Sequence, residues 1–148
     1  MAPQNEIILH GTCVALAESA ALLRGAPGAG KSDLALRFLS AFADEGAVLV
    51  ADDQVRLTRS GEGLIASPPP RLAGLLEVRG IGIVNAAFRE RAPLCLIADL
   101  CDADAVPRLP PEPLPCAEIL GCSVPVLVME PFAASAPAKL KLALDAVP

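Results

Sequence analysis

The stretch that decides the fold is a glycine-rich loop, which runs Gly25-Ala26-Pro27-Gly28-Ala29-Gly30-Lys31-Ser32. It matches the pattern G-x-x-x-x-G-K-[ST] at every fixed position. In this pattern the glycines let successive backbone amides face one concavity. The lysine brings a positive charge to the outer phosphates, and the serine hydroxyl is a ligand for magnesium. All eight residues are therefore candidates for binding the phosphates of a nucleotide.

The segments on either side of the loop favour this interpretation. Ala20–Arg24 is a short apolar strand that leads into the loop, and a helix is predicted to begin near Lys31. Leu34 and Phe38 are four residues apart, so they share one face of that helix, and Gly46 is predicted to follow its end. A helix that begins at the loop directs its positive end toward the same anion.

The rest of the chain predicts an α/β fold with a mixed sheet, because strands and helices alternate only in part. Apolar runs predict strands over 7–10, 13–16, 47–51, 94–98 and 124–129, and a hairpin over 55–57 and 64–66. A short helix is predicted over 71–76, a glycine-interrupted strand over 77–83 and a last helix after Ser135, its predicted cap. The proline-rich stretch 102–116 is predicted to be a loop. The whole chain, 1–148, is interpreted as one domain.

Composition excludes several classes of protein. The chain has 148 residues, of which 53% are hydrophobic and 20% charged, so it is not disordered throughout. No apolar run approaches the ~18–20 residues that cross a bilayer. The net charge is −5 and aromatic residues make up 3%, which argues against a nucleic-acid partner. Five cysteines without a C-x-x-C pair, and no secretory signal, favour a cytoplasmic protein without a disulfide framework or a zinc site.

Two adjacent carboxylates, Asp52 and Asp53, end the strand that follows the predicted helix. In a parallel arrangement this strand end lies beside the phosphate loop. Neighbouring residues of an extended strand point to opposite faces, so only one carboxylate can face the terminal phosphate. The other is left to serve the loop, a metal ion or the turn. A carboxylate here can bind magnesium or act as a general base toward an incoming hydroxyl.

Two further sets of residues stay open at this point. His10 is the only histidine, and a lone histidine at a strand end is more often packed or solvated than catalytic. Glu77 and Arg79 are two residues apart on the predicted strand, so they share a face and can form either a structural ion pair or part of a site.

Together these residues resemble the catalytic domain of the bacterial HPr kinase/phosphorylase family. The matching stretches are His10-Gly11, Gly25–Ser32, Val50-Ala51-Asp52-Asp53 and Leu76–Ile83, in that order. The resemblance implies a P-loop kinase domain similar to phosphoenolpyruvate carboxykinase. It also implies an enzyme that uses ATP and Mg²⁺ to phosphorylate a seryl hydroxyl of HPr, the phosphocarrier protein of the sugar phosphotransferase system.

The resemblance assigns a role to each matching side chain. Ser32 and Glu77 would bind Mg²⁺, Lys31 would stabilise the transferring phosphoryl group, and His10 would join the catalytic cluster. One of the paired carboxylates, Asp53 in the preferred alignment and otherwise Asp52, would take the seryl proton. Arg108, in Pro107-Arg108-Leu109-Pro110, is the candidate for a catalytic arginine of the family.

The chain departs from the family pattern in two places. Full-length members have a separate N-terminal domain and form hexamers, whereas this chain starts just before His10, and we expect no such regulatory domain. Members that also reverse the modification with inorganic phosphate carry a P-V-R-P-G-R-like stretch. The corresponding region, Val124–Pro131, has neither arginine nor glycine. This difference argues against phosphorylase activity and against the hexamer, so a homo-oligomer is left as an open expectation and a kinase-only form is the hypothesis.

Two alternative functions remain. A P-loop kinase or hydrolase of a small metabolite would need an arginine-rich lid, yet the stretch 102–118 holds only Arg108. A non-catalytic module could instead bind ATP and signal through its proline-rich loops. The base that the nucleotide carries is also open, because no base-reading motif stands out and the chain has only four aromatic residues, Phe38, Phe42, Phe88 and Phe132.

Overall fold

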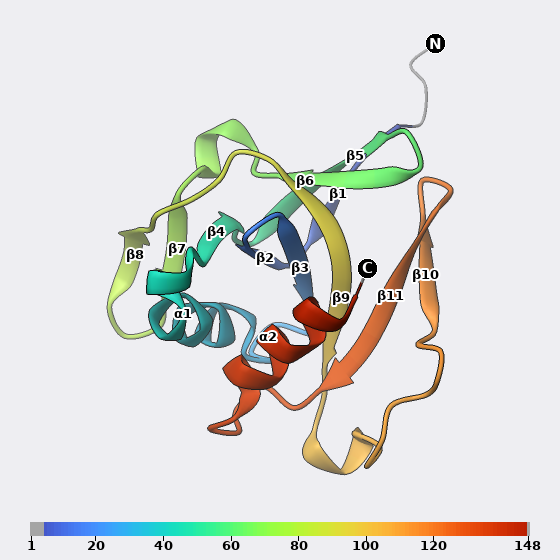
Figure 1. The fold of residues 1–148 in the computed structure, drawn as a ribbon. Helices are drawn as coiled ribbons and strands as arrows, with labels where there is room; N and C mark the ends of the chain where they lie inside the picture. Colours follow the sequence, from blue (N-terminus) through green and yellow to red (C-terminus); the bar gives the residue numbers. More distant parts are fainter. Residues whose placement is uncertain (1–4, 148) are drawn as a thin grey trace.

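One long strand, β9 (Ala92–Leu100), organises the fold because it pairs with three other strands. The structure is a computed structural model that describes residues 5–147. In it β9 runs parallel to β3 (Ser19–Arg24) and β11 (Cys122–Met129), and antiparallel to β6 (Gly63–Ser67). The strand bends strongly along its length, so its two ends belong to different parts of the sheet (Figure 1). The predicted mixed sheet is confirmed.

The large sheet has the strand order β1-β5-β6-β9-β3-β2-β4, and β11 continues it from β9 through to β10. The strands not yet bounded are β1 (Glu6–His10), β2 (Thr12–Leu16), β4 (Val48–Ala51), β5 (Gln54–Ser60) and β10 (Cys116–Ile119). Every pair other than those of β9 with β3 and β11 is antiparallel. Strands β1, β5 and β6 lie above β2, β3 and β4, and the helices lie below them (Figure 1).

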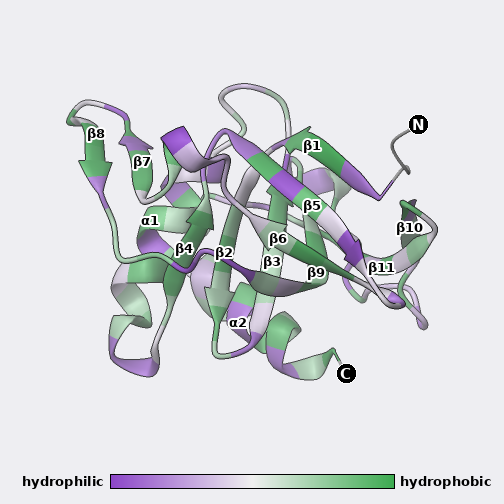
Figure 2. Ribbon diagram, turned by 90° about the horizontal axis from the view of Figure 1, so that it is seen from above, coloured by the Kyte–Doolittle hydropathy of each residue, from purple (hydrophilic) through white to green (hydrophobic). Residues whose placement is uncertain are grey.

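This arrangement creates two apolar cores, one on each face of the central strands. On β3, Leu22 belongs to the core shared with β5 and β6, while the next residue, Leu23, belongs to the core shared with the helices. Successive side chains of a strand point to opposite faces, so β3 is apolar along its whole length. Strand β5 instead alternates between hydrophilic and hydrophobic residues, because only one of its faces is buried (Figure 2).

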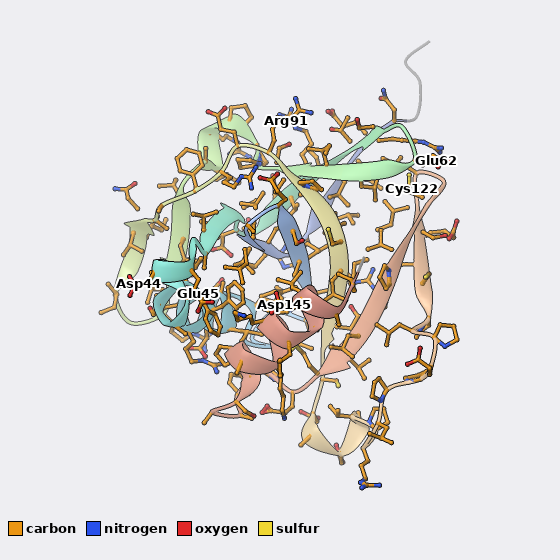
Figure 3. All side chains as sticks on the ribbon, in the orientation of Figure 1. Asp44, Glu45, Glu62, Arg91, Cys122 and Asp145 are labelled. Atoms are coloured by element: carbon orange, nitrogen blue, oxygen red, sulfur yellow. The ribbon has the colours of Figure 1, made fainter. Side chains whose placement is uncertain are left out.

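The helices α1 (Lys31–Ala41) and α2 (Ala136–Ala146) cover the lower core. Helix α1 buries Leu34 and Phe38, as the four-residue spacing predicted. It ends earlier than predicted, at Ala41, and a 3-10 turn (Ala43–Glu45) carries the chain to Gly46. Lys141 of α2 pairs with Asp145 of the same helix at 2.9 Å and with Glu45 of that turn at 3.7 Å, so the second pair links α2 to the turn that follows α1; both carboxylates are labelled in Figure 3.

Two sequence predictions in the region 70–85 were wrong. The predicted helix over 71–76 is only a 3-10 turn, Pro70–Leu72, and the chain is extended again from Leu75. The single strand over 77–83 is instead a hairpin of β7 (Leu75–Val78) and β8 (Gly82–Asn85), which forms a separate two-stranded sheet. Gly80 adopts a φ of 87° in the connecting turn, and this reverses the chain. Arg79 therefore lies in the turn and does not share a strand face with Glu77.

The remaining predictions near the C-terminus hold with one exception. The stretch 102–116 is a loop with one short 3-10 turn, Ala103–Ala105, and β10 begins at its end. Ser135 stands at the N-cap of α2, but its hydroxyl donates no capping hydrogen bond, and the first turn contains Pro137. All five cysteines are free. No helix within residues 5–147 is long and apolar enough to span a bilayer.

Candidate active site

The glycine-rich loop joins β3 to α1, as its sequence predicted. Nζ of Lys31 donates hydrogen bonds to the carbonyl oxygens of Gly25 (2.8 Å) and Ala26 (3.0 Å), so the ammonium group lies under the loop. The first amide to bond within the helix is that of Leu34, which donates to the carbonyl of Gly30 at 2.9 Å. The three amides that precede Leu34 have no helical partner, which is the usual property of a helix N-terminus that binds anions.

An ion pair fixes the position where the loop leaves the sheet. Arg24, the last residue of β3, lies opposite Asp99 of β9 in the parallel register. Its guanidinium donates two hydrogen bonds to that carboxylate, at 2.7 and 2.9 Å. The side-chain hydrogen bond with Asp99 raises the pKa of Arg24, so the guanidinium stays charged. The loop therefore starts from a strand end that is held in place.

The first carboxylate of the pair, Asp52, is buried and serves as a junction between four elements. Its Oδ1 accepts hydrogen bonds from the hydroxyls of Thr12 (2.8 Å) and Ser32 (2.9 Å). Its Oδ2 accepts one from the backbone amide of Glu77 (3.0 Å). Asp52 thus connects the end of β4 to β2, to the first turn of α1 and to the β7–β8 hairpin.

The second carboxylate, Asp53, faces solvent and has a different neighbour. Oδ1 of Asp53 lies 3.5 Å from Nδ1 of His10, and 68% of the Asp53 side chain is exposed. Strand β4 ends at Ala51, and Asp53 adopts a φ of 71°, a left-handed conformation that aspartate and asparagine tolerate better than most residues. The chain turns between the two residues, and this turn separates the buried carboxylate from the exposed one.

A cleft of about 540 Å³ brings most of the predicted site residues together. From the loop it is lined by Pro27, Gly28, Gly30, Lys31 and Ser32, and from the surrounding elements by His10, Asp52, Asp53, Glu77 and Arg79. Gly25, Ala26 and Ala29 complete the loop but do not line the cleft. Arg108 lies elsewhere, beside a second hollow that the loop 102–115 forms with β11.

The oxygen atoms in the cleft suit a magnesium ion. The Ser32 hydroxyl and the Asp52 carboxylate are in contact, and Glu77 lines the same cleft. Mg²⁺ prefers oxygen ligands and is usually bound by one or two carboxylates together with the phosphates of a substrate. Within residues 5–147 no group of three or more His, Cys, Asp or Glu side chains is close enough to hold a metal ion without other ligands.

Thr12 and Phe132 are among the residues that line the cleft and were not predicted as part of the site. Thr12 is fully buried on β2 and contacts Asp52; the only sign of it is a hydroxyl residue that begins an otherwise apolar strand. Phe132 lies in the connection between β11 and α2, and its ring contacts Gly30 of the loop. Each of these contacts joins residues that lie far apart in the chain, so the sequence gives no signal of it.

Comparison with known proteins agrees with this geometry. Residues 1–92 match the family model described as the HPr serine kinase C-terminal domain, which is more than half of the chain. The chain belongs to that family.

Relatives and a solved structure of the HPr serine kinase family show how far the likeness extends. The HPr kinase/phosphorylase of Neisseria meningitidis serogroup B is 39% identical over 105 residues, which cover 66% of this chain and 32% of that protein. The protein of the same name from Shouchella clausii is 38% identical over 104 residues, covering 64% and 32%. The chain thus matches about a third of the length of these relatives.

The fold of the family extends over almost all of the chain. The structure of the Hpr(Ser) kinase/phosphatase from Coxiella burnetii superposes with a TM-score of 0.76 and covers 92% of each chain, at 24% sequence identity. The predicted α/β fold with a P-loop and a mixed sheet is confirmed by this likeness and by the strand order described above.

Proposed function

We propose that the chain catalyses transfer of the γ-phosphoryl group of ATP to a seryl hydroxyl of HPr, in the cytoplasm. The chain belongs to the HPr serine kinase family, and the relatives named above carry this activity in their names. Since the chain matches about a third of their length, the activity and the protein substrate are proposals for this chain.

The observation that carries the proposal is the separation of the two adjacent carboxylates. Asp52 is occupied by three hydrogen bonds and contacts the serine of the phosphate loop. The side-chain carboxylate of Asp53 accepts no hydrogen bond from residues 5–147, lines the same cleft and is open to solvent. A hydrolase needs one carboxylate to organise the metal and a water. A kinase also needs a group that can receive the proton of an incoming hydroxyl, and Asp53 is suited to that role.

In this proposal each residue of the cleft has its own role in phosphoryl transfer. The loop amides and Lys31 hold and neutralise the phosphates of ATP. The seryl oxygen forms a bond to the γ-phosphorus while the bond from that phosphorus to the β–γ bridging oxygen breaks, and ADP leaves. Asp53 takes the seryl proton, and His10 lies within 3.5 Å of it. Ser32, Asp52 and Glu77 are the residues that would hold Mg²⁺, which offsets phosphate charge when it is bound.

The forward direction is the activity that we propose, without the reverse phosphorolysis. The relatives carry phosphorylase in their names, but the segment Val124–Pro131 of this chain contains neither arginine nor glycine. Incubation of seryl-phosphorylated HPr with the protein and inorganic phosphate tests this point. Robust release of pyrophosphate would show that the reverse reaction takes place.

A single assay separates the kinase from its alternatives. The protein is incubated with ATP labelled at the γ-phosphate, Mg²⁺ and HPr, and the label is located. Label on a serine of HPr supports the proposal. Free phosphate without labelled HPr indicates a hydrolase or a kinase of another substrate, and binding of ATP without turnover indicates a nucleotide sensor. An HPr whose seryl acceptor is replaced by alanine is the matched control for the site of modification.

The variant Asp53→Asn tests the role of the base in the same assay. A general base contributes about 10²–10⁴-fold to such a step, so turnover should fall by that factor. Affinity for ATP should stay within about twofold, because within residues 5–147 the Asp53 side chain makes no hydrogen bond or ion pair with the loop. Turnover within a factor of ten of the natural protein would contradict this assignment.

A further inference from the structure

Phe132 places an aromatic ring against the end of the phosphate loop. A Cβ atom built on Gly30 would lie 2.8 and 2.9 Å from two atoms of this ring, so the ring rests against the last glycine of the loop. The ring lines the same cleft as Lys31 and Ser32 and is 62% exposed. Phe132 is the one aromatic residue among those that line the cleft in residues 5–147.

The segment that carries Phe132 is fastened to helix α1. The carboxylate of Glu130 accepts hydrogen bonds from the backbone amides of Phe132 (2.6 and 2.8 Å) and Ala133 (3.1 Å). The guanidinium of Arg37 donates to the carbonyl oxygens of Pro131 and Ala133 and also pairs with Asp33 in the first turn of α1. The backbone on both sides of the ring is therefore held relative to the loop.

The position of Phe132 in the cleft indicates the kind of ligand that the cleft can bind. Single apolar side chains on a surface need no explanation, but this one is mounted beside residues that bind phosphate. Pro27 and Leu36 add apolar surface to the same cleft. A ligand that suits this lining combines a polyphosphate with a flat, apolar ring system, which is the composition of a nucleoside triphosphate. The face of an aromatic ring stacks on any base and does not require a hydrogen-bonding motif.

We propose that Phe132 stacks on the base of the nucleotide and makes the site prefer a nucleotide over a bare polyphosphate. This inference rests on the proposed function, in which the loop binds the phosphates of ATP. It also answers a question that the sequence left open, namely which of the four phenylalanines lies where it can meet the base.

Calorimetry in Mg²⁺ buffer tests the proposal by comparing ADP with pyrophosphate, which shares its phosphates and lacks the base. The variants are Phe132→Ala, Phe132→Trp and, as a control, Phe88→Ala, which removes another partly exposed phenylalanine (40%) outside the cleft. Phe132→Ala should weaken ADP binding by roughly 5- to 150-fold, the range for loss of one base stack, and leave pyrophosphate binding within about twofold. Phe132→Trp should retain ADP affinity, and Phe88→Ala should change neither.

The other results are equally decisive. If Phe132→Ala weakens ADP and pyrophosphate equally, the ring supports the loop and does not stack on the base, so the proposal is overturned. The same holds if neither affinity changes, or if the natural protein binds both ligands equally well. A natural protein that binds neither ligand overturns the proposed function, and this inference with it. Circular dichroism of each variant shows that it is folded.

Discussion

The buried carboxylate of Asp52 allows a quantitative test of the site's architecture. In Asp52→Asn, one carboxylate oxygen becomes an NH₂ group, which cannot accept a hydrogen bond. If the amide oxygen keeps the bonds from Thr12 and Ser32, the NH₂ group faces the amide of Glu77, and two donors oppose each other. If the side chain is flipped, the two hydroxyls must turn round. In either case at least one charge-assisted hydrogen bond is lost.

The magnitude follows from that loss. A hydrogen bond to a charged group contributes about 1.5–3 kcal/mol, and in a domain of this size 1 kcal/mol shifts the melting temperature by about 2–4 °C. We therefore expect Asp52→Asn to melt about 3–12 °C below the natural protein. Thr12→Val, which keeps the shape and removes one donor, should melt lower as well and should not add its full effect to that of Asp52→Asn.

The neighbouring residue is the matched control for this measurement. Asp53→Asn makes the same chemical change on an exposed side chain, and asparagine tolerates the left-handed backbone of that position. Its stability should stay within about 0.5 kcal/mol of the natural protein, or about 1–2 °C. Thermal denaturation followed by circular dichroism gives both values. Equal melting temperatures for the two variants would show that Asp52 does not hold the four elements together.

Two further predictions concern the loop and the core. Gly30→Ala and Gly46→Ala both place a side chain at a positive φ (101° and 89°), with a strain of about 1–2 kcal/mol each. Only the side chain added in Gly30→Ala also collides with Phe132. Calorimetry should therefore show ADP binding weakened by about tenfold or more in Gly30→Ala and unchanged in Gly46→Ala. Equal ADP affinities of the two variants would contradict this. Burial raises the pKa of the Cys13 thiol far above its ordinary value of 9.0. The unfolded chain therefore releases this proton at a pH where the folded protein keeps it. Urea denaturation should show a free energy of unfolding that falls as the pH rises past about 9, with a weaker fall in Cys13→Ala; parallel curves for the two proteins would refute this.

The parts of the site that the sequence predicted are those with local signals. The phosphate loop has a fixed spacing, and the strand before it and the helix after it have apolar patterns of the matching period. The pair Asp52-Asp53 could be placed at a strand end, and the structure gives the two carboxylates different surroundings, one buried and one exposed, although both line the cleft. What the sequence could not show was which carboxylate is buried and which is exposed, since the strand ends at Ala51 and the direction of each side chain depends on the turn that follows.

The parts that were missed depend on contacts between distant residues or on backbone turns. Thr12 meets Asp52, and Phe132 meets Gly30, across long separations in the chain. The hairpin of β7 and β8 was interpreted as one strand because Ile81 and Ile83 continue the alternation of apolar residues across two glycines. The positive φ of Gly80 reverses the chain there, and a period-two pattern does not distinguish a continuous strand from such a turn.

Because the chain turns between Asp52 and Asp53, substitutions at these two positions should affect protein abundance and function differently. In a library scored once for protein abundance and once for function, substitutions at position 52 should reduce both scores, since the same side chain anchors four elements. At position 53 the two scores should diverge for asparagine and glycine, which suit the backbone and lack the carboxylate. Substitutions at two adjacent positions would thus report separately on the stability of the fold and on the activity of the site.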